Sequence, residues 1–179
     1  MQQPQSPTLL YASRAGIVFG LYFAIKYLAL MYMIPHPGLS LAFLLGTLFV
    51  PFLAYRLTKS YREIIAPVGD FSFRDGWVFG VLIYLFASIV VLIPHYIFYT
   101  RLLPEQFPIL AEKLSEIYAQ LPEIYQQHQL LLGGEPLEIM TEQMQQLPVG
   151  RMLVADVLNN VFLGSLLSLI NAALLRRKA

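Results

Sequence analysis

The sequence predicts an all-α polytopic membrane protein with four transmembrane helices and an extracytoplasmic helical hairpin between the third and the fourth. Of its 179 residues, 57% are hydrophobic and 13% are charged, whereas soluble domains carry about 25% charged residues. Four apolar stretches, near 9–34, 39–57, 75–99 and 149–175, have about the length of ~20 residues that crosses a bilayer as a helix. One acidic segment, 101–147, separates the last two. Residues 1–179 are therefore expected to form a single four-helix domain.

The first stretch is interpreted as an uncleaved span, because a signal-peptide core has only about 7–15 apolar residues. Small residues recur at spacing four along the spans, and such residues let two helix backbones approach closely in lipid. The alternative is that small residues are simply common in membrane helices. The predicted helix-packing residues are Gly16, Gly20, Gly46, Gly80, Gly164 and Ser168.

Two spans carry a polar stripe. Steps of four and seven return a helix to nearly the same angle, so Gly80, Tyr84, Ser88 and His95 share one side of the third span. Lipid offers no partner to a carboxylate or a carboxamide, so the stripe of the fourth span should face protein. That second stripe consists of Asp156, Asn160, Gly164, Ser168 and Ala172.

The polar residues of the spans predict a cluster in the outer half of the bundle. At a helical rise of ~1.5 Å per residue, Asp156 lies ~10 Å, His95 ~7 Å and Lys26 ~12 Å from the outer ends of their spans. These depths are compatible with a His95–Asp156 contact, whereas the angular position of Lys26 argues against its joining them. Three interpretations remain open: a structural clamp, a partner-facing polar patch, or a proton-linked or polar-ligand site with Asn159 and Asn160 as donors.

The acidic segment contains an amphipathic pattern. Leu110, Leu114, Ile117, Leu121 and Ile124 form a narrow apolar seam. Pro122 is expected to divide this helix, Gly133-Gly134 to act as a hinge, and Pro136 to open a second helix. The seam needs cover, which the second helix, another subunit or the membrane surface would supply.

Charge sets the predicted orientation. The short loop after the second span and the C-terminus are basic, and positive charge stays in the cytoplasm. Both termini are therefore expected inside the bacterial cytoplasmic membrane, with the acidic segment outside. Three loop residues either follow this rule alone or also bind anionic lipid headgroups; they are Arg56, Lys59 and Arg62.

Several function classes are disfavoured. The chain has no cysteine and a net charge of +1, which excludes thiol chemistry and argues against nucleic-acid binding. His36 and His128 stand apart from other ligand residues, so no metal site is predicted. No nucleophile elbow or phosphate loop occurs, so neither a cofactor nor an enzyme activity is expected.

Three segments together carry a family resemblance. They are Gly69-Asp70-Phe71-Ser72-Phe73, then Leu147-Pro148-Val149-Gly150, and the C-terminal run from Ser168 to Lys178. In this order the chain resembles a family of small four-span membrane proteins of Bacteroidota, the domain of unknown function 4199. The resemblance implies a fold and a membrane location but no activity. It also implies a partner, because such genes often neighbour one for a membrane-associated family-2 glycosyltransferase.

The first functional hypothesis is a non-enzymatic accessory or scaffold subunit of the membrane, in a homo-oligomer or with another membrane protein. The partner would then be a glycosyltransferase of envelope or lipid-linked sugar assembly. The second hypothesis is a small proton-linked transporter or channel component that uses the polar cluster. A transporter needs a hydrated path to that cluster, whereas a scaffold needs packed helices and an exposed apolar surface.

Overall fold

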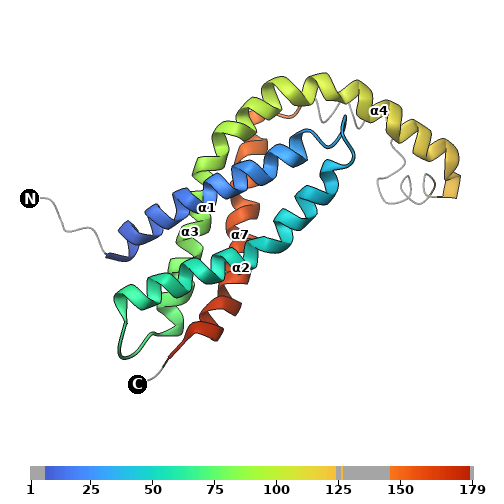
Figure 1. Cartoon of the computed structure of the whole chain (residues 1–179). Helices are drawn as coiled ribbons and strands as arrows, with labels where there is room; N and C mark the ends of the chain where they lie inside the picture. Colours follow the sequence, from blue (N-terminus) through green and yellow to red (C-terminus); the bar gives the residue numbers. More distant parts are fainter. Residues whose placement is uncertain (1–6, 124–125, 127–145, 178–179) are drawn as a thin grey trace, which may run out of the picture.

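The computed structural model describes residues 7–123, 126 and 146–177, and in this part of the chain all the regular elements are helices. Four of them are long: α1 (Pro7–Met31), α2 (Leu39–Ile65), α3 (Phe73–Ile97) and α7 (Val149–Leu175). A π-helical turn, η1 (Phe98–Leu102), joins α3 to α4 (Leu103–Gln120) (Figure 1). Four helical segments are long and apolar enough to cross a membrane, with α3 to α4 counted as one. The chain is therefore an all-α, multi-pass membrane protein.

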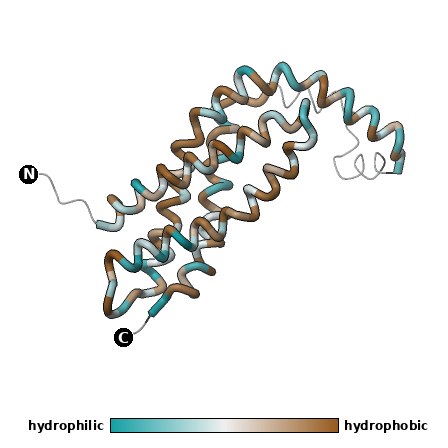
Figure 2. Tube along the Cα trace, in the orientation of Figure 1, coloured by the Kyte–Doolittle hydropathy of each residue, from teal (hydrophilic) through white to brown (hydrophobic). Residues whose placement is uncertain are grey.

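Helix α3 is the centre of the bundle. Its most extensive contacts are with α1 and with α7, and α2 packs mainly against α1. The polar stripe predicted for α3 is buried, from Gly80 through Tyr84 and Ser88 to His95. Apolar residues colour most of the four long helices in Figure 2, while hydrophilic residues gather at their ends and along α4. The core thus lies along α3, and apolar side chains on the outer faces of the helices are left for lipid.

Close backbone approaches at small residues hold these helices together. A Cβ on Gly16 or Gly20 would meet Phe86 or Val90 of α3, and one on Gly80 would meet Ser168 of α7. Gly164 lies directly against the ring of Tyr84, and Gly46 against Lys26 and Tyr22. All six small residues expected at helix interfaces therefore lie in them.

Helical conformation does not stop near residue 99, where the third span was predicted to end. The chain passes through η1 into α4 without leaving helical conformation, and α4 then bends across the ends of α1 and α2 (Figure 1). Hydropathy marks where apolar residues stop, which is not where a helix must stop. A π-turn absorbs an extra residue within a helix and redirects the next turns. Pro94 lies inside α3 without ending it, and Pro104 is in the first turn of α4, where a missing N–H costs little.

The predicted hairpin is described only in part. Helix α4 ends at Gln120, two residues before Pro122, and Leu121 has left helical geometry with φ −131°. This agrees with the break expected there, because the residue before a proline avoids the α region. Ile124, the hinge at Gly133-Gly134 and the helix expected after Pro136 lie outside the described residues.

Helix α2 runs to Ile65, beyond the predicted limit of the span at Leu57. The extension is stabilised by packing, because Thr58 and Tyr61 are buried and the Tyr61 ring stacks on Phe79 at 4.0 Å. Helix α1 ends earlier than predicted, at Met31, and a series of turns connects it to α2.

A clasp closes the end of the bundle where α2 ends, α3 begins and α7 ends, here called the clasp end. Phe71 and Arg177 exchange two backbone hydrogen bonds of 3.0 Å. The Arg177 guanidinium donates to the carbonyls of Ala66 and Gly69, at 2.6 and 2.9 Å. The α2–α3 loop and the end of α7 are thereby held together. The opposite end, where α3 passes into α4, is called the α4 end.

Candidate functional site

A polar cluster lies between α1, α3 and α7 in the half of the bundle nearer the α4 end. Its centre is Asp156 of α7, whose Oδ2 lies 2.7 Å from Nδ1 of His95. The hydroxyl of Tyr99 donates to the same oxygen, also at 2.7 Å. The structure thus brings His95 and Asp156 together, at the similar depth and on the facing sides that the stripes predicted.

Helix α1 completes the cluster through Tyr27. Its hydroxyl donates to Oδ1 of Asn160 at 3.1 Å, and its ring meets the His95 ring edge-on at 4.5 Å. Asn160 lies one turn from Asp156 along α7, so one face of that helix holds both polar groups. The polar cluster therefore consists of Tyr27, His95, Tyr99, Asp156 and Asn160, and it connects three helices.

Two of the predicted cluster residues lie elsewhere. Asn159 is exposed on α7, because its neighbour Asn160 takes the inward position. The ammonium of Lys26 lies over the rings of Phe23, Tyr27 and Phe43, at 4.4 to 5.2 Å from their centroids. These rings stabilise the charge through cation–π contacts. Lys26 faces α2 while Gly16 and Gly20 face α3, which is the angular separation that its sequence position implied.

The carboxylate of Asp156 is used unevenly. Both bonds go to Oδ2, and Oδ1 receives no hydrogen bond from the part of the chain that the structure describes. The side chain of His95 is 8% exposed and that of Asp156 is 25% exposed. The cluster therefore combines a satisfied interhelical connection with one accessible acceptor oxygen.

A cavity of about 300 Å³ lies one helical turn from the cluster, towards the α4 end. Tyr99 lines it, together with Leu103 and Phe107 on one side and Val149 and Met152 on the other. Apart from Tyr99, the residues that line it are apolar, and Tyr99 is also the residue that binds Asp156. This combination is the usual anatomy of a site for a small ligand.

Two members of the cluster were not predicted. Tyr99 comes four residues after His95, so the two share a helix face, and that spacing was the available signal. The predicted end of the span at residue 99 concealed it. Tyr27 belongs to the same turn of α1 as Lys26, which attracted the prediction by its charge.

No group of three potential metal ligands occurs among the described residues. His95 and Asp156 are two residues of types that bind metals. The other group at Oδ2 of Asp156 is the Tyr99 hydroxyl.

The three basic residues predicted to contact headgroups separate in the structure. Arg62 turns inward and donates to the carbonyl of Leu175 at 3.3 Å. Lys59 forms an i,i+4 ion pair with Glu63 at 3.9 Å. Arg56 is exposed and has no partner in the part of the chain that the structure describes. Only Arg56 and Lys59 thus remain directed towards the surroundings.

Fold and cluster define the class: a four-span α-helical membrane protein with a polar connection between its helices. The chain belongs to the family described as Protein of unknown function (DUF4199), whose model matches residues 14–177. That match includes all of α2, α3, α4 and α7 and most of α1. Neither a curated protein nor a solved structure matches the chain.

Proposed function

We propose that the protein is a non-enzymatic accessory or scaffold subunit of the bacterial cytoplasmic membrane, and that α4 is the element that receives its partner. The observation that carries this proposal is the attachment of α4 to the end of α1 by two hydrogen bonds. Helix α4 bends over the end of the bundle, is bound there to α1, and continues beyond the bundle with an apolar edge.

Two hydrogen bonds fix α4 to the end of α1. Gln106, which is buried, donates to the carbonyl of Met31 at 2.8 Å. The ammonium of Lys113 donates to the carbonyl of Ile34. These carbonyls lie at and just after the end of α1, where a helix leaves acceptors without internal partners. The two bonds therefore supply donors to backbone carbonyls at the end of α1 and also hold α4 in place.

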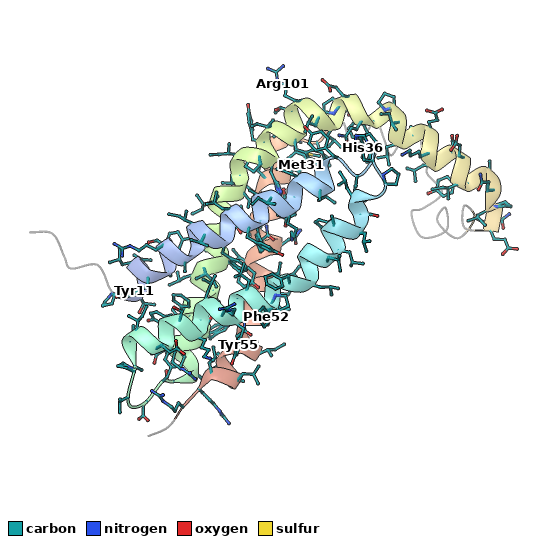
Figure 3. The ribbon with its side chains drawn as sticks, viewed as in Figure 1. Tyr11, Met31, His36, Phe52, Tyr55 and Arg101 are labelled. Atoms are coloured by element: carbon teal, nitrogen blue, oxygen red, sulfur yellow. The ribbon has the colours of Figure 1, made fainter. Side chains whose placement is uncertain are left out.

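The face of α4 that contacts the bundle continues beyond it. At 100° per residue, Ile117 continues the side that carries Gln106, Phe107 and Lys113, and Leu121 follows directly after the end of the helix. Phe107 is buried, but Ile117 and Leu121 are 46% and 48% exposed. In Figure 3 the far half of α4 extends past His36 and the start of α2, and no other helix of the described residues lies against it. The exposed apolar edge thus forms an overhang beyond the described helices of the bundle.

A transmembrane helix of a second protein, standing beside α1 and α2, would fit beneath this overhang. It would cover the apolar edge, while Glu105, Glu112 and Glu116 on the opposite face of α4 stay in water. The family resemblance suggests a membrane glycosyltransferase of envelope or lipid-linked sugar assembly as this partner. A second copy of the chain is the alternative occupant.

The test is purification of the tagged protein from its native membrane in mild detergent, with measurement of particle mass and identification of co-purifying chains. We expect a stoichiometric second protein that is lost from Ile117→Asp and retained by Ala119→Asp. The control adds the same charge at an exposed position on the opposite face of α4. A homogeneous self-oligomer without a second protein would refute the hetero-subunit role.

A second candidate function is a small proton-linked transporter or channel component. The accessible Oδ1 of Asp156 and the cavity beside Tyr99 favour it, since a carried ion or ligand needs an unoccupied acceptor on a path from the surface. Liposomes containing the purified protein would then show a proton flux that Asp156→Asn abolishes and Asn159→Ala leaves unchanged. Equal proton fluxes through the unchanged protein and both variants would exclude this function. A flux no greater than that of protein-free liposomes would exclude it as well.

A further inference from the structure

We propose that the outer face of α2 near the clasp end binds one anionic phospholipid, with its phosphate at Arg56 and Lys59 and an acyl chain along Phe49 and Phe52. This site is independent of α4 and of the proposed subunit role. It assigns a ligand to Arg56 and Lys59, whose positive charge the preference for basic residues on the cytoplasmic side would otherwise explain.

The site is a groove of about 620 Å³ on α2. Phe49, Phe52 and Leu53 line one part of it, and Arg56, Lys59 and Ser60 line the part nearer the clasp end. Phe52 and Phe49 lie about 6 and 10 Å from Arg56 along the helix axis, at ~1.5 Å per residue. The groove therefore passes from apolar to cationic along the axis of α2, in the order in which a phospholipid presents its chain and its phosphate.

Exposure supports a ligand of this kind. Phe49 and Phe52 are 46% and 53% exposed, although the Phe49 ring also meets the Tyr22 ring of α1 at 6.0 Å. Arg56 has no partner among the described residues, so its guanidinium is available for a phosphate, which it matches with paired N–H donors. Figure 3 shows Phe52 and Tyr55 on α2, towards its end at the clasp.

Charge complementarity selects an anionic lipid. Lys59 also forms an ion pair with Glu63. Solvent weakens this pair, because the distance is long and both side chains are about half exposed. Glu63 also lines the groove, but it lies one turn further from the apolar part than Lys59, so Arg56 and Lys59 are the charges nearest the acyl chain. Arg62 contributes nothing here, because its side chain donates to Leu175.

The position suits a headgroup in either topology. The clasp end of α2 lies at a membrane surface whichever side that surface faces, since the helix begins at the opposite end of the bundle. Tyr55 borders the groove at the same level, where an amphipathic aromatic ring is favoured at the interface.

The experiment is native mass spectrometry of the purified full chain in detergent, titrated with phosphatidylglycerol or phosphatidylcholine. We expect one phosphatidylglycerol to be retained in preference to phosphatidylcholine. Each lost cation weakens retention about fivefold, so Arg56→Gln should show that loss and Arg56→Lys should largely restore binding. The matched control is Arg74→Gln, because Arg74 is exposed at the same end of the bundle and lies outside the groove.

The apolar part of the site has its own pair of variants. Phe52→Asn should weaken phosphatidylglycerol retention without a change in charge. Leu48→Asn places the same side chain at an exposed position of α2 that does not line the groove, and should retain the lipid. Helical content and elution volume, measured for every variant, separate a lost lipid from a lost fold.

Three results would overturn the proposal. Equal retention of the two lipids would remove the headgroup contact. Equal losses in Arg56→Gln and Arg74→Gln would indicate diffuse positive charge in place of a site. Displacement of the lipid by millimolar glycerol 3-phosphate would identify a site for a soluble anion.

Discussion

At the scale of single residues, Asp156 determines how α3 and α7 meet. One carboxylate oxygen receives two donors, from His95 in the last turn of α3 and from Tyr99 in η1, which fixes both the depth and the rotation of the two helices. In lipid no water competes for these donors, so the bonds persist although each contributes only ~0.6 kcal/mol on average. The residue is therefore positioned to clamp the bundle whether or not it also has a second role.

The clamp predicts different results for two substitutions. Asp156→Ala removes the acceptor and leaves the Tyr99 hydroxyl and the His95 nitrogen unpaired, which should cost about 1–2 kcal/mol. Asp156→Asn keeps one acceptor oxygen and should be much milder. Thermal unfolding in detergent is expected to show a Tm drop of about 2–6 °C for the alanine variant only. An equal drop in both would mean that the negative charge itself is required.

Gly164 provides a steric test. A Cβ there would enter the ring of Tyr84, whereas a Cβ on Gly150 of the same helix meets nothing within 4 Å. Gly164→Ala should therefore destabilise the bundle by about 1–3 kcal/mol through overpacking. Gly150→Ala should be neutral or slightly stabilising, because alanine favours the helix. Melting curves of the two variants compare them directly, and equal melting would show that α7 can shift to accept the methyl group.

The sequence was most informative at this scale where a physical rule restricts the choice. Polar groups within the bilayer are expected to face protein. The structure agrees with this rule, because it buries Ser88, His95 and Ser168. The role of Arg177 could not be predicted, because its guanidinium binds backbone carbonyls of a loop whose path the sequence does not specify. Asn159 and Asn160 are chemically equivalent, but only Asn160 belongs to the stripe at spacing four from Asp156, and it is the one that lies inward.

At the scale of elements, the continuous run from α3 through η1 to α4 is the main feature that hydropathy did not predict. The apolar pattern located all four spans, because the membrane fixes their length and composition. It did not locate helix ends, since Arg56 to Ile65 and the residues after Tyr99 are polar yet helical. Tertiary contacts, such as the stacking of Tyr61 on Phe79, determine those ends instead.

The attachment of α4 predicts a local effect. The double variant Gln106→Met and Lys113→Met keeps side-chain length but removes both donors to the turns after α1. Hydrogen exchange of the α4 amides should become faster by about tenfold or more, at ~0.5–1.5 kcal/mol per bond. The amides of α3 should exchange as before. Glu112→Ala, at an exposed position of α4, is the control, and unchanged exchange in the double variant would show that the helix is held by other contacts.

At the scale of the whole molecule, the two ends of the bundle differ in charge and construction. The clasp end carries arginines and a loop bound to the C-terminal residues, while the α4 end carries an acidic helix. Both termini of the described chain lie at the clasp end, as Figure 1 shows. With the positive end in the cytoplasm, the orientation predicted from the sequence places α4 outside.

The absence of cysteine in the chain makes this orientation directly testable. Val68→Cys places a thiol in the loop before α3, at a residue that is 93% exposed, and Ser115→Cys places one on the exposed surface of α4. A membrane-impermeant maleimide applied to intact cells, with the outer membrane permeabilised, should label Ser115→Cys and leave Val68→Cys unlabelled until lysis. The reverse pattern would invert the topology.

The central position of α3 also affects how the chain is made. A ribosome completes α3 before α7 exists, so Ser88 and His95 enter the bilayer while the helix that will cover them is still unsynthesised. The nascent three-span intermediate therefore presents a polar edge to lipid or to the insertion machinery until α7 arrives. A premature stop before Asp156 would make that edge permanent, and such a fragment is a natural substrate for the proteases that clear unassembled membrane proteins.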